Sequence, residues 1–270
     1  MKKFAQSLLL IVTAAASFTA CKKEAGQPET ATPPAMEAQT SRDNFTPIEA
    51  APKLVKKGGD SLVYNADGSL QKVIRSASEF TSYTKLGNLL TAVYFFNNVF
   101  VGKIEYTLDA TGRATEAKHI GFASNNGSSP VFVYQYDASN RLTKCYNKLN
   151  PTVYSKFIWA ASSKQLNQVK WYNGGNYESS AIYFTYKLEA DHLKTWSKRT
   201  GLDSYLNIFG SRPAKMIASE DLQNYDNPAL SKHEYSSYNY NSDGYPVKQE
   251  VHTFGTWAHV ATIEYKYSQQ

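Results

Sequence analysis

The sequence has only two cysteines in 270 residues, Cys21 and Cys145. If Cys21 is modified, as argued below, Cys145 is the only remaining thiol, and the chain forms no disulfide. Five histidines occur, and none stands at a metal-ligand spacing with cysteine or with paired carboxylates. The sequence therefore predicts no metal site, and nothing in it indicates a cofactor.

Motifs that carry catalytic chemistry are also missing. The chain has no glycine-rich phosphate loop and no Gly-x-Ser-x-Gly elbow. Ser82-Tyr-Thr-Lys85 matches a Ser-x-x-Lys pattern, but the helix start and the partner motifs that this chemistry needs are lacking. Cys145 lies on a predicted strand without a nearby base, which indicates a buried structural thiol. We expect a protein that is not an enzyme.

Clusters of one charge and long helical patterns are scarce as well. The 29 lysines and arginines exceed the 23 acidic residues, but they are spread along the chain and form no nucleic-acid footprint. No segment of helical period is long enough to cover a sheet. We therefore expect an all-β protein that does not bind nucleic acid.

What is present begins with the N-terminus. Lys2 and Lys3 precede a short apolar run, Leu8–Ala16, and the small residues Thr19 and Ala20 precede Cys21. This arrangement predicts a secretory signal over residues 1–20, too short for a membrane span. A cysteine directly after the small residues resembles the lipobox of bacterial lipoproteins. That resemblance implies that Cys21 is lipidated and becomes the new N-terminus, anchored by several acyl chains.

One residue departs from the lipobox pattern, because Phe18 stands where an aliphatic residue is usual. Ordinary secretion with a chance cysteine is the alternative. The sequence after Cys21, Lys22-Lys23-Glu24, lacks the aspartate that resembles an inner-membrane retention signal. We therefore expect an outer-membrane location, with the choice between the periplasmic and the surface leaflet left open.

Residues 21–59 are predicted to form a tether behind the lipidated cysteine. They contain five prolines and many Ala, Thr, Glu and Gln residues, without a sustained apolar period. Such a composition buries too little apolar surface to offset the entropy of ordering. Residues 60–270 then form the folded domain.

A turn pattern recurs through this domain. Each copy has an apolar or aromatic residue, then Asp or Asn, two small or polar residues, and Gly or Asn. Asp or Asn accepts backbone hydrogen bonds within the turn, and Gly or Asn tolerates the left-handed conformation that closes it. The predicted turn-forming residues are Asp67, Gly68, Asp109, Gly112, Asp137, Asn140, Asp243 and Gly244. Degenerate copies follow Trp159 and Leu188.

The segments between the turns alternate with period 2. In Val131–Cys145, for example, Phe132, Tyr134 and Tyr136 share one face, and Val133 and Gln135 share the other. The pattern predicts an antiparallel up-and-down meander of about 14–16 strands with one apolar face. Such a sheet covers its own apolar face by closing into a β-barrel, or by folding into a two-sheet sandwich.

The hairpins resemble the tyrosine-aspartate (YD) repeats of large toxin-shell proteins. Together with the lipoprotein signal, residues 60–270 more closely resemble a Bacteroidetes lipoprotein family of unknown function with a porin-like fold. The resemblance implies an up-and-down β-barrel and no catalytic residues.

A membrane-inserted pore is disfavoured by the residues themselves. Tyrosines, 20 in all, occur throughout the strands rather than at their ends, and the mean hydropathy is negative. We expect the apolar face to line the barrel interior, with the barrel held at the membrane only by its lipid.

Two functions remain open. The first is a non-enzymatic, lipid-anchored envelope protein that presents its barrel for binding or structural interaction. The second is a lipoprotein that holds a small apolar molecule or a glycan in the barrel interior or mouth. The candidate stacking residues are Trp159, Trp171, Trp196 and Trp257, for which core packing is the alternative. The sequence does not decide whether the binding partner is a glycan, a lipid or a protein.

Overall fold

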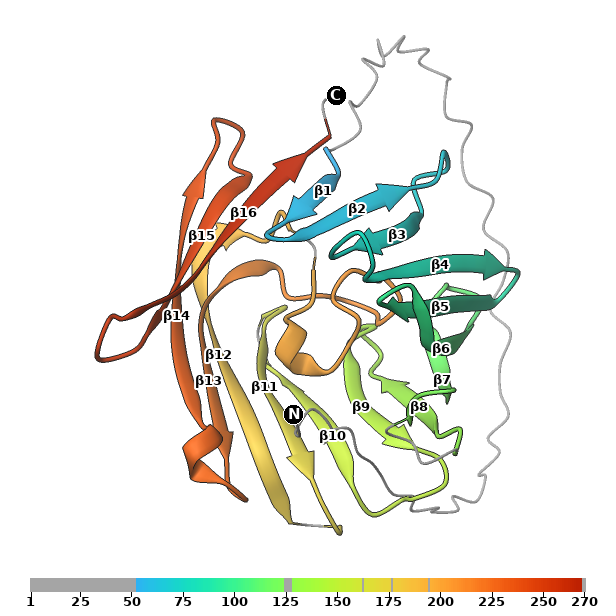
Figure 1. Cartoon of the computed structure of the whole chain (residues 1–270). Coiled ribbons are helices and arrows are strands. Elements are labelled where there is room, and N and C mark those ends of the chain that lie inside the picture. Colours follow the sequence, from blue (N-terminus) through green and yellow to red (C-terminus); the bar gives the residue numbers. More distant parts are fainter. Residues whose placement is uncertain (1–51, 124–127, 162, 176, 194, 269–270) are drawn as a thin grey trace, which may run out of the picture.

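Sixteen antiparallel strands follow one another through the part of the chain that the structure describes. The structure is a computed structural model, and it describes residues 52–123, 128–161, 163–175, 177–193 and 195–268. Each strand pairs with the next, and β1 pairs with β16, so the sheet closes on itself (Figure 1). The predicted all-β barrel is confirmed. The sandwich alternative is wrong, because the ring of paired strands is continuous.

The strands are mostly short, as is usual for a meander. The first eight are β1 (Leu54–Lys57), β2 (Asp60–Tyr64), β3 (Leu70–Ile74), β4 (Phe80–Leu86), β5 (Leu89–Phe96), β6 (Val99–Leu108), β7 (Ala114–Ile120) and β8 (Val131–Tyr136). The next eight are β9 (Leu142–Asn147), β10 (Tyr154–Trp159), β11 (Leu166–Tyr172), β12 (Glu178–Ala190), β13 (Lys215–Asn224), β14 (Lys232–Tyr240), β15 (Pro246–Thr253) and β16 (His259–Tyr267). Strand β1 lies inside the predicted tether, so the barrel begins earlier than residue 60.

Side chains alternate between the inside and the outside of the barrel. In β6, Ile104, Tyr106 and Leu108 are buried, whereas Thr107 between them is exposed. The apolar face therefore lines the interior, as the period-2 pattern predicts. None of the described residues forms a helix long and apolar enough to cross a membrane.

Connections alternate between the two ends of the barrel, because consecutive strands are antiparallel. All four turns of the repeated pattern lie at one end, called here the turn end; the opposite end is called the loop end. At the turn end, Asp137 accepts hydrogen bonds from the backbone N–H groups of Ser139 and Arg141, both at 2.9 Å. Asn140 closes this turn with a φ of 61°.

Two of the other three turns are built in the same way. Asp109 accepts from the N–H groups of Thr111 and Arg113, and Asn241 accepts from those of Asp243 and Tyr245. The closing glycines have positive φ angles of 84°, 82° and 80° at Gly68, Gly112 and Gly244. Asp67 differs, because it accepts from the N–H and the hydroxyl of Ser69 while Asn65 opens the turn.

A second feature of the turn end is a set of tyrosine and tryptophan side chains that donate hydrogen bonds inside the barrel. Each lies near the end of an even-numbered strand and donates to a carbonyl oxygen near the start of the preceding strand, at 2.7–3.0 Å. These bonds join the two strands of a hairpin at the end away from its own loop. The pairs are Tyr64–Leu54, Tyr136–Ala114, Trp159–Leu142, Tyr186–Leu166, Tyr238–Ile217 and Tyr267–Pro246.

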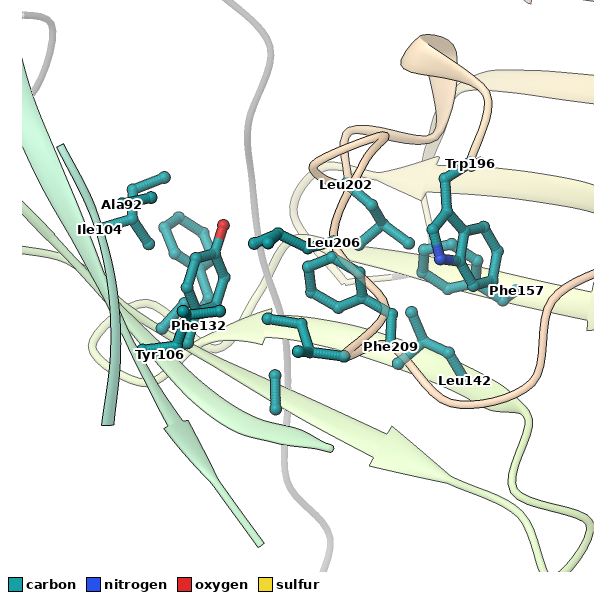
Figure 2. Close-up of a cluster of buried hydrophobic side chains, with 14 of the residues drawn as sticks. Ala92, Ile104, Tyr106, Phe132, Leu142, Phe157, Trp196, Leu202, Leu206 and Phe209 are labelled. Carbon is teal, nitrogen blue, oxygen red and sulfur yellow. The ribbon is translucent and has the colours of Figure 1, made fainter. Parts of the chain in front are cut away.

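The barrel is not empty, because the connection between β12 and β13 folds into it (Figure 1). We call residues 191–214 the plug; residue 194 lies outside the described residues. The plug contains a short 3-10 helix, η2 (Lys198–Thr200), and another, η3 (Pro228–Leu230), lies between β13 and β14. Apolar plug residues meet the wall in the main core (Figure 2): Trp196, Leu202, Leu206, Ile208 and Phe209 pack with Ile104, Tyr106, Phe132, Leu142 and Phe157.

Backbone contacts fix the plug to the turn end. The N–H of Ala114 donates to Ile208 O at 2.7 Å, and the N–H of Ser211 donates to Asn140 O at 2.6 Å. The sequence predicts a turn after Leu188 that leads into a return strand, and this prediction is wrong. The chain there enters the interior instead, because the barrel is wider than the wall side chains can fill.

Candidate functional site

The plug divides the barrel interior and leaves a cavity of about 460 Å³ on one side of it. The cavity lies between the plug and the wall formed by β12–β16 and β1. Its lining reaches Gly58 and Val260 at the loop end of the barrel. A volume of this size is within the range of small-molecule sites.

A charge cluster lies in the wall of this cavity. Glu220 of β13 and Glu234 of β14 are directly opposite each other, and like charges so placed destabilise a sheet. The guanidinium of Arg199, from η2, bridges them at 3.4 Å and 2.5 Å. Ser197 donates its hydroxyl to Glu220. Burial raises the pKa of the Glu220 carboxyl, and the Ser197 hydrogen bond and the Arg199 charge oppose that rise.

A second polar group lies nearby on β1 and β2. The Lys57 ammonium donates to Thr195 Oγ1 at 3.0 Å, and burial lowers its pKa to about 8, with Lys198 adding repulsion. Asp60 accepts from the hydroxyl of Tyr205 at 2.5 Å and from Lys198 Nζ at 3.2 Å. These bonds tie the plug to the first hairpin.

Two buried donors in the cavity lining lack a partner among the described residues. They are Nε1 of Trp196 and Nη1 of Arg199, both on the plug. A buried donor without an acceptor costs about 1–3 kcal/mol. The cavity thus offers donors for an oxygen-bearing ligand or for water, beside the apolar surfaces of Phe184, Met216 and Tyr265.

A smaller cavity of about 180 Å³ lies on the other side of the plug. Asp203 reaches into it from the plug, and the hydroxyl of Tyr83 donates to its carboxylate at 2.9 Å. Burial raises the pKa of Asp203, and it also raises the pKa of the Cys145 thiol to about 12. The thiol is therefore held protonated, which is unsuitable for a nucleophile.

The four candidate tryptophans do not form one site. The ring centroids of Trp159 and Trp196 lie 6.4 Å apart, and Trp159 Nε1 donates to Leu142 O at 2.7 Å. Trp171 is half-buried and lines the smaller cavity, whereas Trp196 is buried and lines the larger one. Trp257 lies apart in the β15–β16 hairpin, 62% exposed, with its ring edge against Tyr235.

Sequence reasoning did not find Arg199, Glu220, Glu234 or Lys57. Glu220 and Glu234 lie in strands where they read as outward-facing charges, and Arg199 lies in a segment without any period. The available signal was the segment 202–209, in which five of eight residues are apolar or aromatic without the strict period-2 alternation of the strands on either side. Among the described residues, no cluster of three or more His, Cys, Asp or Glu side chains is arranged to hold a metal ion. Cys21 and most of the predicted tether lie outside the described residues.

Comparisons with known proteins identify the fold. No protein-family model matches the chain, and no curated protein matches it. A porin-like protein from Bacteroides uniformis ATCC 8492 is 12% identical, with a TM-score of 0.56 over 77% of this chain and 90% of that one. A porin-like protein from Bacteroides vulgatus ATCC 8482 is 14% identical, with a TM-score of 0.51 over 81% and 100% of the two chains. At these identities the likeness shows a shared β-barrel fold alone.

Proposed function

We propose that this chain is a non-enzymatic, lipid-anchored protein of the cell envelope whose barrel stands in water as a body for binding or structural interaction. The observation that carries the proposal is the presence of charged side chains on the outer wall of the barrel. Charged pairs lie on it in mid-strand, such as Lys103–Glu105 at 2.5 Å and Lys248–Glu250 at 2.6 Å. A lysine facing lipid at the bilayer midplane costs about 2–4 kcal/mol, so such a wall suits water.

The interior supports the same proposal. A pore needs a continuous aqueous channel, and here the plug packs apolar side chains such as Phe209 and Leu206 against the wall. Membrane attachment would then depend on the acyl chains at Cys21. The small residues before Cys21, the absence of aspartate after it and the likeness to porin-like Bacteroides proteins favour the outer membrane; the leaflet is left open.

Labelling with an alkyne fatty acid tests the anchor. The wild-type chain and a Cys145→Ser control should both take up label and stay in the membrane fraction at high salt, because the half-buried Cys145 thiol lies inside the barrel and its pKa is raised. Cys21→Ser should take up no label. Equal labelling of Cys21→Ser and the wild type would overturn the proposal.

A second candidate function is the binding of a small molecule or glycan in the 460 Å³ cavity. The observation that favours it is the pair of unpartnered donors, Trp196 Nε1 and Arg199 Nη1, in the lining of a cavity that also has apolar walls. An amphipathic ligand with oxygen acceptors would satisfy both kinds of surface.

Intrinsic tryptophan fluorescence tests this second function. A panel of monosaccharides, disaccharides and fatty acids is titrated into the wild type, Trp196→Phe and Trp257→Phe. A cavity ligand should give a saturable change that Trp257→Phe keeps and Trp196→Phe loses, because only Trp196 lines the cavity. No saturable change in the wild type with any member of the panel would contradict interior binding.

A further inference from the structure

The inner face of the barrel wall changes from apolar to polar around its circumference. On β5 and β8 the buried side chains are apolar, such as Ala92 and Phe132. Beside the larger cavity, β13, β14 and β15 instead present Glu220, Glu234 and Gln249 to the interior. Burying polar side chains is costly unless they find hydrogen-bond partners. Their concentration beside one cavity indicates a site for a polar ligand.

The charges in the cavity lining balance. Basic and acidic side chains occur there in equal number, four of each. Arg199 bridges Glu220 and Glu234, so the two carboxylates share one cation. A charged ligand would add a charge that this lining does not neutralise, and an uncompensated buried charge is costly. The cavity therefore favours a ligand without net charge.

The hydrogen-bonding groups of the lining are of both kinds. Trp196 Nε1, on a side chain that is 1% exposed, and Arg199 Nη1 are donors without a partner among the described residues. The carboxylates of Glu220 and Glu234 are acceptors. Each carboxylate has about four acceptor positions, and Arg199 and Ser197 occupy only part of them. A hydroxyl group both donates and accepts, so a ligand rich in hydroxyls satisfies both sets of groups.

Apolar surface lies beside these polar groups. Phe184, Met216 and Tyr265 line the same cavity, and the hydroxyl of Tyr265 donates to Gln249 Oε1 at 2.5 Å. A sugar ring has C–H groups on its faces and hydroxyls around its edge, which matches this mixture. An acyl chain would leave the buried donors unpaired, which costs affinity.

The sheet is open where the cavity reaches the loop end. Strand β16 begins at His259, whereas β1 ends at Lys57 (Figure 1). Their pairing covers Tyr265–Tyr267, and Gly58 adds a bond from its N–H to Glu264 O at 2.7 Å. In the described part of the chain, no strand pairs with residues 259–263 on that side. Residues 260–263 border the cavity, so a ligand is able to enter beside the β1–β2 hairpin.

We propose that the cavity binds a neutral monosaccharide or disaccharide, with Arg199 and Trp196 donating to its oxygens and Glu220 and Glu234 accepting from its hydroxyls. This inference rests on the second candidate function above and specifies its ligand. The cavity volume of about 460 Å³ is in the range of small-molecule sites. Hydrogen bonds to the charged groups of Arg199 and the glutamates are the stronger kind, and they supply the affinity.

Isothermal titration calorimetry tests the ligand class. The protein is the mature chain, residues 21–270, with Cys21→Ser so that no acyl group contributes. The neutral sugars are glucose, galactose, mannose, N-acetylglucosamine, maltose, cellobiose and lactose; glucuronate, galacturonate and decanoate are the charged ligands. At least one neutral sugar should bind saturably, and both uronates should bind at least about tenfold more weakly than the best neutral sugar, because their carboxylate is uncompensated.

Glu234→Gln tests the site with the best neutral sugar. The variant keeps the size and an acceptor oxygen but removes the charge, and it should weaken binding about tenfold. Glu264→Gln is the matched control, because Glu264 is exposed on the outer face opposite Lys248; it should change binding less than about twofold. Thermal unfolding by circular dichroism checks that both variants are folded.

The outcomes separate this inference from the function on which it rests. Equal effects of Glu234→Gln and Glu264→Gln would overturn the site, and equal binding of uronates and neutral sugars would overturn the ligand class. Saturable binding of decanoate without binding of any sugar would overturn the inference and leave ligand binding in the cavity standing. Absence of binding by every ligand of the panel would overturn both. The panel is measured on the parent protein, so these last two outcomes do not depend on a variant that folds.

Discussion

The hydroxyl of Tyr136 donates a hydrogen bond of 2.7 Å to the carbonyl oxygen of Ala114, which lies 22 residues earlier in the chain. The same Ala114 donates its N–H to Ile208 of the plug, and the guanidinium of Arg113 lies 4.7 Å from the centroid of the Tyr136 ring. One aromatic side chain thus joins two neighbouring strands, a turn and the plug. Tyr136, which precedes Asp137 in the repeat, thus fastens the β7–β8 hairpin from inside the barrel.

Tyr136→Phe removes only this hydroxyl, and we expect it to lower the free energy of unfolding by about 1 kcal/mol, or somewhat more because a buried carbonyl loses its partner. Urea unfolding monitored by fluorescence measures the loss. Tyr146→Phe is the control, since its hydroxyl has no partner in the described part of the chain; it should change stability by less than about 0.5 kcal/mol. Equal effects of the two variants would contradict the role given to Tyr136.

Phe209→Ala tests whether the plug belongs to the folding core. The ring of Phe209 is 1% exposed and contacts Tyr106 and Tyr134 at centroid distances of 5.9 Å and 5.4 Å. Its removal should cost about 3–5 kcal/mol in the same unfolding experiment. Leu188→Ala, at a side chain that is 88% exposed, should cost less than about 0.5 kcal/mol. A small effect of Phe209→Ala would mean that the barrel folds without its plug.

Gly210 and Gly174 form a matched pair, because both have a φ of 71°. A β-carbon at Gly174 meets open space, whereas one at Gly210 overlaps the carbonyl oxygen of Asn140. Gly174→Ala should therefore cost about 1–2 kcal/mol from the left-handed backbone alone. Gly210→Ala should cost about 1–3 kcal/mol more, because the plug must move away from the turn. Thermal unfolding of the two variants side by side checks the difference, and equal melting temperatures would refute it.

His119 makes stability depend on pH. It packs against Phe132 with ring centroids 4.7 Å apart, and burial lowers its pKa from 6.5 to about 4. The folded state keeps the ring neutral while the unfolded state takes up a proton below pH 6.5. Stability is therefore lost as the pH falls from about 6.5 to about 4, by up to about 3 kcal/mol from this residue.

Urea unfolding at pH 7.5 and pH 4.5 isolates this contribution by comparison with His119→Phe. The variant has no titrating ring, so its loss of stability between the two pH values should be smaller than that of the wild type by about 2 kcal/mol. Identical losses in the two proteins would show that His119 does not titrate differently in the folded state.

Much of the barrel could be predicted because its information is local. The alternation in β6 and β8 determines which side chains face inward, and Asp109, Asp137 and Asn140 mark where strands reverse. Neither needs knowledge of distant parts of the chain. Strand order follows as well, since each strand in a meander pairs with the next.

The plug and the charge cluster could not be predicted, because they depend on contacts between distant residues. Arg199 bridges Glu220 and Glu234 only after the plug has folded inside the barrel. The inner face of β13 borders a cavity rather than a packed core, so it includes a glutamate. The sequence alternation of β13 therefore does not show which of its acidic side chains point into the barrel. The pairing of β1 with β16 could not be predicted either, because β1 is only four residues long and its alternation is too short to recognise.

The pairing of β1 with β16 also governs when the barrel is able to fold. Lys57 and Tyr265 are partners in the sheet although almost the whole domain separates them in sequence. A growing chain therefore exposes two unpaired sheet edges until its final strand has emerged, and such edges invite aggregation. Contacts of such long range make closure a late and slow event. The barrel therefore closes only after the last residues of β16 are available to pair with β1.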